Sequence, residues 1–220
     1  MSMNRLRAII LTTLALVGTF LTAATGPAPA ATEQHVVLAG GCFWGMQAVF
    51  ESVRGVTHVV AGFSGGAADT AHYEMVSTGT TGHAESVDVT YDPSKISFEQ
   101  LLGVYFLVAH DPTELNRQGP DDGTQYRSEI YYTDAQQRDQ ANAYIASLTK
   151  GKVYADPIVT KVAPLNGFYP AEAYHQDYLV HNPDNPYIVY NDLPKLRALR
   201  QKYPALVNES AAPMRVVAKN

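Results

Sequence analysis

The chain changes from a strand to a helix within the stretch His35–Gly45, which reads HVVLAGGCFWG. Residues 35–39 form a short apolar run typical of a buried strand, and Gly40-Gly41 ends it. From Cys42 onward the apolar residues recur at helical spacing, at Phe43, Met46, Val49, Phe50 and Val53. Gly55 stands where the C-terminal cap of a helix belongs. The stretch therefore predicts a strand, a glycine turn and a helix that begins at the cysteine.

The pattern downstream predicts more strands and helices without strict alternation. Strands are expected over residues 56–63, 83–91, 126–132 and 158–162, and helices over 97–109, 134–150, 171–180 and 193–203, with a short helical turn over 72–78. Capping boxes, Ser97 with Gln100 and Asp134 with Gln137, open two of the helices. This mixture predicts an α+β fold rather than a doubly wound sheet. Residues 31–220 are expected to form a single catalytic domain, with a core over about 35–203 and a short C-terminal tail.

The first thirty residues, 1–30, have the three parts of a secretory signal peptide. Arg5 and Arg7 precede an apolar run over residues 8–24, and Ala28-Pro29-Ala30 matches the A-x-A cleavage pattern. The alternative is an uncleaved membrane anchor, but the run is short for a membrane span and is interrupted by threonines and a glycine. We expect cleavage near Ala30, export to the periplasm or the medium, and no stable membrane association afterwards.

Composition excludes several classes of function. The 220 residues carry a formal net charge of −5, and 46% of them are hydrophobic, which is ordinary for a folded chain. A nucleic-acid-binding protein would normally show a basic face. The single cysteine excludes an intrachain disulfide and any metal site built from several cysteines. We expect a monomer with no bound metal or cofactor and no nucleic-acid partner.

Cys42 is the candidate nucleophile. It stands at the start of a predicted helix, where unpaired backbone N–H groups and the helix dipole favour a thiolate. Phe43 and Trp44 follow it and are suited to forming a small apolar pocket. The competing interpretation is a buried core thiol, because free cysteine is among the most buried residue types.

Glu85 is the candidate acid. Alternation along residues 83–91 places it on the same face as Val87 and Val89, a face that should be apolar. A carboxyl group there is desolvated, so its pKa should rise towards neutrality, which suits a proton donor. A strand-end glutamate that reaches solvent is the competing interpretation.

Two other functions fit some of these residues. A thiol hydrolase or acyltransferase would use Cys42 with His83 or His175 as its base, would form an acyl-enzyme and would need no reductant. An exported binding module would hold a small apolar group in the aromatic pocket, and alkylation of Cys42 would leave its function largely intact.

Four motifs resemble, in order, those of the A-type peptide methionine sulfoxide reductases. They are Gly41–Gly45 (GCFWG), Thr81–Glu85 (TGHAE), Gly123–Ser128 (GTQYRS), and Phe168–Glu172 (FYPAE) with His175-Gln176. The resemblance covers about residues 35–203. It implies a two-layer α/β sandwich of ferredoxin-like type, with a mixed sheet and an irregular C-terminal extension. It also implies thiol-dependent reduction of methionine-S-sulfoxide, free or in oxidised proteins, to methionine through a sulfenic acid on Cys42.

The resemblance further implies roles for the residues around Cys42. Tyr73 and Tyr126 match the two tyrosines that hydrogen-bond the sulfoxide oxygen in the family. Asp121 matches the family's aspartate near the active site. Phe43 and Trp44 match the apolar wall that takes the methyl group of the substrate.

The sequence departs from the family pattern in two places. Pro120 stands before Asp121 where the family often has Asn, and it removes a side-chain amide and a backbone N–H from this loop. Many members also carry resolving cysteines near the C-terminus, and this chain has none. The oxidised Cys42 must therefore be reduced by an external thiol, such as a thioredoxin-like protein, a small thiol or dithiothreitol.

Overall fold

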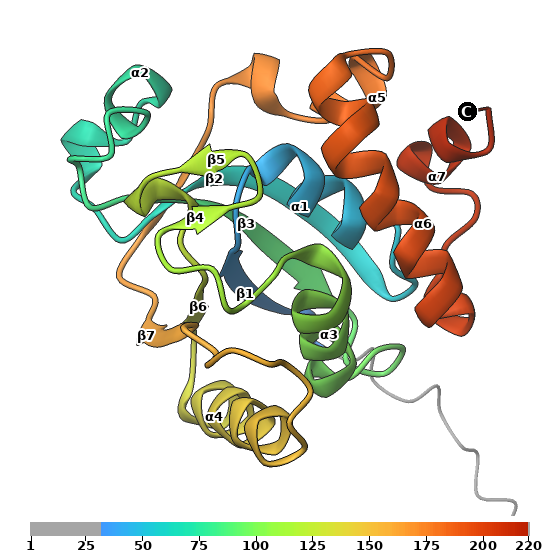
Figure 1. The fold of residues 1–220 in the computed structure, drawn as a ribbon, viewed down its shortest axis with the longest axis horizontal. Coiled ribbons are helices and arrows are strands. Elements are labelled where there is room, and N and C mark those ends of the chain that lie inside the picture. Colours follow the sequence, from blue (N-terminus) through green and yellow to red (C-terminus); the bar gives the residue numbers. More distant parts are fainter. Residues whose placement is uncertain (1–31, 220) are drawn as a thin grey trace, which may run out of the picture. The chain divides into compact units, whose positions relative to one another are not determined.

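The computed structural model describes residues 32–219, so the predicted signal peptide over residues 1–30 lies outside the described residues. At its centre is a six-stranded sheet with the order β7-β6-β1-β3-β2-β8 (Figure 1). The strands are β1 Gln34–Ala39, β2 Val56–Ser64, β3 Ala84–Tyr91, β6 Glu129–Tyr132, β7 Lys161–Pro164 and β8 Phe168–Pro170. Strands β6 and β7 pair in parallel, while the other neighbours are antiparallel. A separate two-residue hairpin joins β4 Arg117–Gln118 to β5 Asp121–Asp122.

Helices pack beside this sheet. They are α1 Phe43–Glu51, α2 Tyr73–Val76, α3 Phe98–Val104, α4 Ala135–Lys150, α5 Tyr178–His181, α6 Leu193–Lys202 and α7 Ala212–Val217. Two π-helical segments, Tyr105–Ala109 after α3 and Ile188–Asp192 before α6, have the wider turn that often marks functional sites. Within residues 32–219, none of the helices combines the length and hydrophobicity needed to cross a bilayer.

The four central strands follow the connectivity of a ferredoxin-like fold. Helix α1 connects β1 to β2, and β3 lies between these two strands and is antiparallel to both, which is the split βαβ arrangement. Strand β6 completes the set on the other side of β1. The predicted α+β fold of ferredoxin-like type with a mixed sheet is confirmed, and β7 and β8 extend its two edges.

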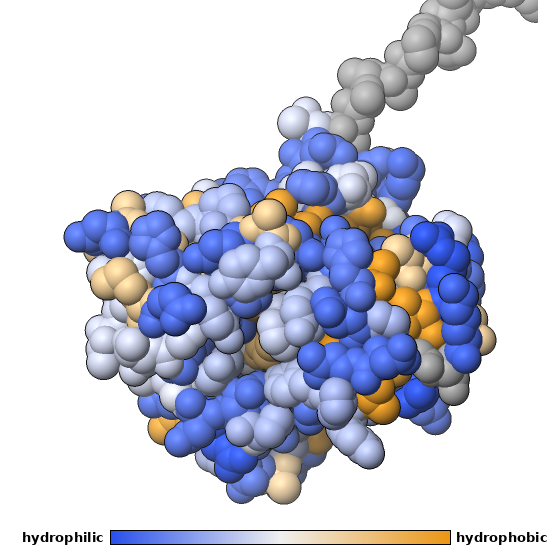
Figure 2. All heavy atoms as spheres, turned by 90° about the horizontal axis from the view of Figure 1, so that it is seen from above, coloured by the Kyte–Doolittle hydropathy of each residue, from blue (hydrophilic) through white to orange (hydrophobic). Residues whose placement is uncertain are grey.

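The two faces of the sheet are covered differently. Val36 and Leu38 of β1 belong to the main core, into which α1, α3 and α6 also pack. Val37 and Ala39 point to the opposite face, as alternation requires, and belong to a small cluster that Leu165 and Phe168 border. Figure 2 shows a mainly hydrophilic outer surface, with hydrophobic residues gathered towards one end. The helices thus enclose the side of the sheet on which α1 and Cys42 lie.

Several predicted boundaries are wrong. The strand expected over residues 126–132 begins at Glu129, because Thr124–Tyr126 forms a 3-10 turn. The strand expected over 158–162 forms at Lys161–Pro164, where it pairs with β6. Residues 171–180 are not one helix: Asp177 has a left-handed φ of 53° and separates a 3-10 turn from α5.

The β4–β5 hairpin, strand β8 and helix α7 were not predicted. Strand β8, Phe168–Pro170, is three residues long and too short to show alternation. Helix α7, Ala212–Val217, lies in the segment expected to be an irregular tail, and it buries Met214 and Val217.

The two predicted helix starts differ in detail. Ser97 and Gln100 form the complete capping box. At α4 the Asp134 carboxylate accepts the Gln137 N–H, but the Gln137 carboxamide oxygen accepts the N–H of Thr133 instead of that of Asp134. Half of the second box is therefore present.

Candidate active site

Cys42 lies between β1 and α1 as the N-cap residue of the helix, and it is 8% exposed. The two preceding glycines allow other segments to come close. A Cβ at Gly40 would lie 2.8 Å from Cγ of His110, and one at Gly41, whose φ is 91°, would lie 2.7 Å from Cβ of Gln118. The glycine turn therefore packs the loop that carries Gln118 directly against the approach to Cys42.

The thiol of Cys42 is held in its protonated form. Burial raises its pKa well above the usual value, and the nearby carboxyl groups of Glu85 and Asp192 raise it further. A hydrogen bond from the Trp44 backbone N–H and the charge of Lys195 act in the opposite direction but are outweighed. The prediction that the helix start favours a thiolate is therefore wrong for the free protein.

Glu85 is on β3, 2% exposed, on the face that also carries Val87 and Val89. Its Oε2 accepts a hydrogen bond from the backbone N–H of Phe43 at 3.0 Å. The pKa of Glu85 is raised to about 8, because burial and the charge of Asp121 outweigh the hydrogen bond from the Phe43 N–H, which lowers it. The expected desolvation is observed, and Glu85 is a neutral acid at neutral pH.

Two phenols lie near this acid and the thiol. Tyr73 begins α2, and Tyr126 ends the 3-10 turn before β6. Burial raises the pKa of Tyr126, and the charges of Glu85, Asp121 and Cys42 raise it further. The pKa of Tyr73 is also raised, first by burial and then by Glu85. Both hydroxyls therefore remain protonated and can donate hydrogen bonds.

Asp121 is in the β4–β5 hairpin, whose turn passes through Gly119 and Pro120. Gly119 has a φ of 56°, a left-handed conformation that a glycine adopts readily. The half-buried carboxylate of Asp121 accepts a hydrogen bond from the hydroxyl of Tyr187. Burial raises its pKa. The loop containing Pro120 thus places Asp121 beside Cys42.

The two aromatic residues after Cys42 have different surroundings. Phe43 is almost fully buried, and its ring lies 5.7 Å from that of Phe63 and 5.0 Å from that of His175, centroid to centroid. Trp44 is partly exposed and stacks on Tyr178, with a centroid distance of 3.7 Å and an interplanar angle of 8°. Its indole N–H donates to Nδ1 of His175 at 3.1 Å. Phe43 and Trp44 thus belong to an aromatic cluster that includes His175, and Trp44 is its more accessible member.

A small cavity of about 90 Å³ opens beside the thiol. It is lined by Cys42, Gln118, Gly119, Pro120, Asp121, Tyr187, Asn191 and Lys195. A larger cavity of about 580 Å³ lies elsewhere, at the C-terminal end of α4, and includes none of these residues. Of these two cavities, the small one contains the candidate nucleophile, but Glu85, Tyr73, Tyr126, Phe43 and Trp44 are not among its lining residues.

Sequence reasoning missed four residues here: Tyr187, Asn191, Asp192 and Lys195. One signal was available. Asp192, Leu196 and Leu199 follow the i, i+4, i+7 spacing of one helical stripe, so Asp192 is a carboxyl group on an apolar face. The same kind of anomaly identifies Glu85 in its strand.

The candidate histidine bases have other partners. Nδ1 of His83 accepts the Gly66 N–H at 3.2 Å, and its Nε2 lies 2.9 Å from the Ala67 carbonyl oxygen. Nδ1 of His175 accepts the indole N–H of Trp44, and burial lowers the pKa of this imidazole. Within residues 32–219 no cluster of three His, Cys, Asp or Glu side chains is placed to hold a metal ion. The geometry therefore favours a thiol and a neutral carboxylic acid over a Cys–His dyad.

Comparison with known proteins agrees with this geometry. The family model of the peptide methionine sulfoxide reductases matches residues 34–206. The chain is 58% identical over 177 residues to the peptide methionine sulfoxide reductase MsrA 2 of Mesorhizobium japonicum, covering 80% of this chain and 91% of that protein. It is 51% identical over 170 residues to MsrA 2 of Synechocystis sp., covering 77% and 79% of the two chains.

Two solved structures share the fold. Mxr1 of Saccharomyces cerevisiae in reduced form has a TM-score of 0.65 at 31% identity, covering 72% of this chain and 90% of that one. Methionine sulfoxide reductase A of Corynebacterium diphtheriae has a TM-score of 0.61 at 35% identity, with 71% and 77% covered. By the family match, the identities and the shared fold, the chain belongs to the A-type peptide methionine sulfoxide reductases.

Proposed function

We propose that the chain reduces methionine-S-sulfoxide, free or within a polypeptide, to methionine, with Cys42 as the nucleophile and Glu85 as the proton donor. The observation that carries this assignment is the hydrogen bond between Glu85 and the Phe43 N–H, which fixes a neutral carboxylic acid beside the thiol-bearing helix start. A sulfoxide oxygen needs a proton as its bond to sulfur breaks, and a neutral acid supplies it.

The first half of the reaction transfers the oxygen atom to Cys42. Cys42 releases its proton to solvent and attacks the sulfoxide sulfur as the thiolate, and the proton of Glu85 goes to the sulfoxide oxygen. Glu85 then takes up a proton from solvent before the next turnover. The oxygen ends on Cys42 as a sulfenic acid, so the cysteine sulfur is oxidised by two electrons while the substrate sulfur is reduced to the thioether. Tyr73 and Tyr126, both protonated, donate hydrogen bonds to the oxygen, while Phe43 and Trp44 contact the methyl group.

The second half needs a thiol from outside the chain. Cys42 is the single cysteine of the 220 residues, so no second thiol of this chain can condense with the sulfenic acid. An external thiol condenses with it to a mixed disulfide and water, and a second thiol then releases Cys42. A thioredoxin-like protein and a small dithiol both have the required chemistry.

The export of the chain is a separate proposal. It rests on the charged start, the apolar run and the A-x-A site within residues 1–30. N-terminal sequencing of the protein purified from a bacterial periplasm is expected to begin just after Ala30. A start at residue 1 or 2 would show that the segment is retained.

A single-turnover experiment tests the enzymatic proposal. Mature protein without any reductant, mixed with excess S-sulfoxide, should give one methionine per Cys42 and a mass increase of one oxygen on that residue. The R-sulfoxide should give neither product. Adding dithiothreitol should convert the burst into continuous turnover, and Cys42→Ser should abolish both phases.

The hydrolase alternative makes the opposite prediction. A Cys-dependent hydrolase would form an acyl-enzyme with an activated ester and turn over without reductant. Continuous turnover of ester substrates together with no methionine release would contradict the reductase assignment.

A further inference from the structure

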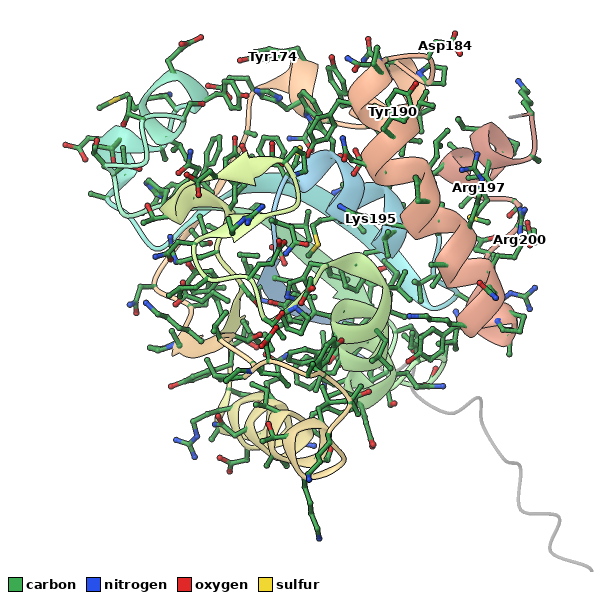
Figure 3. All side chains as sticks on the ribbon, viewed as in Figure 1. Tyr174, Asp184, Tyr190, Lys195, Arg197 and Arg200 are labelled. Atoms are coloured by element: carbon green, nitrogen blue, oxygen red, sulfur yellow. The ribbon has the colours of Figure 1, made fainter. Side chains whose placement is uncertain are left out.

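A buried charge pair lies at the start of α6. Asp192 is 0% exposed, and its Oδ1 lies 3.3 Å from Nζ of Lys195. The Lys195 side chain is 18% exposed. Figure 3 shows Lys195 on the side of α6 that faces α1, whereas Arg197 and Arg200 lie on the outer side. Of these three basic residues on α6, Lys195 is thus the one directed into the protein.

This pair packs against the first turn of α1. A Cβ at Gly45 would overlap Oδ1 of Asp192 and would lie 3.0 Å from Nζ of Lys195. Gly45, the last residue of the GCFWG motif, has no side chain, and this leaves the room that the Asp192–Lys195 pair occupies. Lys195 also lines the small cavity together with Cys42, so the two residues border the same space.

A contribution to folding stability does not explain the Asp192–Lys195 pair well. Oδ2 of Asp192 is buried and has no hydrogen-bond partner among the described residues. Removing two charges from water costs more free energy than their attraction returns unless further hydrogen bonds satisfy them. Hydrophobic side chains would serve packing better here, because Leu193, Leu196 and Leu199 of the same helix are buried. An incompletely satisfied ion pair beside a reactive sulfur is better explained by the chemistry of that sulfur.

We propose that Lys195, held against α1 by Asp192, is a positioning residue that stabilises the negative charge on the Cys42 sulfur, both when it attacks and when it is released by the external thiol. The second of these roles rests on the function proposed above. Asp192 anchors the ammonium group and limits its effect, because its own charge disfavours the anion.

The release step shows where this charge is needed. The mixed disulfide Cys42–S–S–R is attacked by a second thiolate R′S⁻ at the sulfur of R. The disulfide R–S–S–R′ forms. The S–S bond between the Cys42 sulfur and the sulfur of R breaks, and its electron pair stays on the Cys42 sulfur, which leaves as the thiolate. A leaving thiolate departs faster when it is better stabilised.

The other groups that face Cys42 do not supply this stabilisation. Glu85 from β3 and Asp192, which ends the π-helical segment before α6, oppose the anion, and Asp121 of the β4–β5 hairpin and Tyr187 line the same cavity. The Trp44 N–H contributes one hydrogen bond. Lys195 is the cation among the groups that act on the thiol.

The test measures the reactivity of Cys42 without any sulfoxide. Alkylation by iodoacetamide is followed across pH in wild type, Lys195→Met, Lys195→Arg and Asp192→Asn. Lys195→Met should shift the profile to higher pH and slow alkylation at neutral pH roughly tenfold, which corresponds to about one pKa unit. Lys195→Arg should restore most of the rate, and Asp192→Asn should shift the profile in the opposite direction, to lower pH. Arg197→Met is the matched control, because it removes the same charge from the exposed side of the same helix.

A second measurement follows release of Cys42 from its mixed disulfide with 2-mercaptoethanol, using dithiothreitol and detection by mass spectrometry. Lys195→Met should slow release by a similar factor, whereas Arg197→Met should not. Circular dichroism establishes that each variant is folded. If Lys195→Met does not fold, the shift to lower pH expected of Asp192→Asn and the nearly wild-type profile expected of Lys195→Arg still test the assignment.

An alkylation profile of Lys195→Met that coincides with wild type, or an equal shift in Arg197→Met, would overturn the inference. Neither measurement uses a sulfoxide, so these outcomes are independent of whether the chain reduces methionine sulfoxide.

Discussion

The backbone N–H of Phe43 and the carboxyl group of Glu85 are joined by a 3.0 Å hydrogen bond across 42 positions of sequence. The next N–H in the helix, that of Trp44, donates to Cys42. Two neighbouring donors at the start of α1 are thus divided between the acid and the nucleophile. This division holds the two reactive groups side by side without relying on a direct bond between them.

Replacing Glu85 by a residue that still accepts the Phe43 N–H separates its role as proton donor from its role as hydrogen-bond acceptor. In Glu85→Gln the amide oxygen still accepts the Phe43 N–H, but no acidic proton is available. We expect the rate of methionine formation to fall by roughly 10²–10⁴, the usual contribution of a general acid, with little change in substrate affinity. Single-turnover rates and equilibrium binding measure the two effects, and Asp122→Asn, an exposed carboxyl in the neighbouring hairpin, is the control. A wild-type rate in Glu85→Gln would remove Glu85 from the mechanism.

The pH dependence of the first half-reaction follows from the same carboxyl group. With a pKa of about 8, Glu85 holds its proton below that pH and loses it above. Because the pKa of Cys42 lies well above that value, the single-turnover rate should rise with pH as the thiolate forms and level off above about pH 8, where loss of the Glu85 proton offsets further formation of thiolate. In Glu85→Gln the residual rate should keep rising past about pH 8. The same levelling near pH 8 in both proteins would assign it to another group.

Arg127 is expected to be a main determinant of stability near the site. Its guanidinium donates to Glu129 at 2.6 Å, to the Tyr131 hydroxyl at 2.8 Å and to the carbonyl oxygens of Gly82, His83 and Thr124. Arg127→Met would leave the carboxylate of Glu129 buried without its cation, which costs about 3–5 kcal/mol of unfolding free energy. Urea denaturation measures the loss. Arg138→Met, which breaks an exposed pair with Asp139, should cost less than about 1 kcal/mol, and equal losses in the two variants would contradict this account.

Glu51 should make stability depend on pH. Burial, together with a hydrogen bond to the Asp177 side chain and the charge of Asp177, raises its pKa from 4.5 to about 9. Between these two values the folded chain binds a proton that the unfolded chain does not, so the free energy of unfolding should fall as pH rises through this window. Above about pH 9 this contribution is constant.

Denaturation at several pH values tests this expectation. In Glu51→Gln the carboxamide can still donate to Asp177 but does not titrate, so the slope of stability with pH should be smaller than in wild type. Glu99→Gln, at an exposed position, should keep the wild-type slope. Parallel curves for Glu51→Gln and wild type would show that Glu51 titrates normally.

Local patterns were sufficient for the elements that carry Cys42 and Glu85. A strand, two glycines and a helix stripe located the cysteine at a helix start, and period-two alternation located Glu85 on the buried face of β3. Both patterns are set by a few neighbouring residues. The order of the strands in the sheet needs contacts between distant segments, and here the family resemblance supplied what periodicity did not.

The ionisation of Cys42 and the α6 side of the site required the tertiary structure. A helix start lowers the pKa of a thiol only where water or cations also stabilise the thiolate. At Cys42, burial and the nearby carboxyl groups of Glu85 and Asp192 raise the pKa instead. Lys195 lies 153 positions from Cys42 in the sequence, and its approach depends on how α6 packs on α1. No local pattern reports that packing, although Asp192 on an apolar stripe marked the helix as unusual.

The protonated resting state of Cys42 has a consequence for survival under oxidative stress. Hydrogen peroxide reacts with thiolates far faster than with thiols. A thiol kept neutral by burial is therefore a poor target for the oxidant whose damage the enzyme repairs. In the proposed mechanism the bound sulfoxide receives a proton from Glu85 and places its methyl group against Phe43 and Trp44, whereas peroxide has no methyl group to place there. The buried thiol is thus expected to react with methionine sulfoxide in preference to hydrogen peroxide.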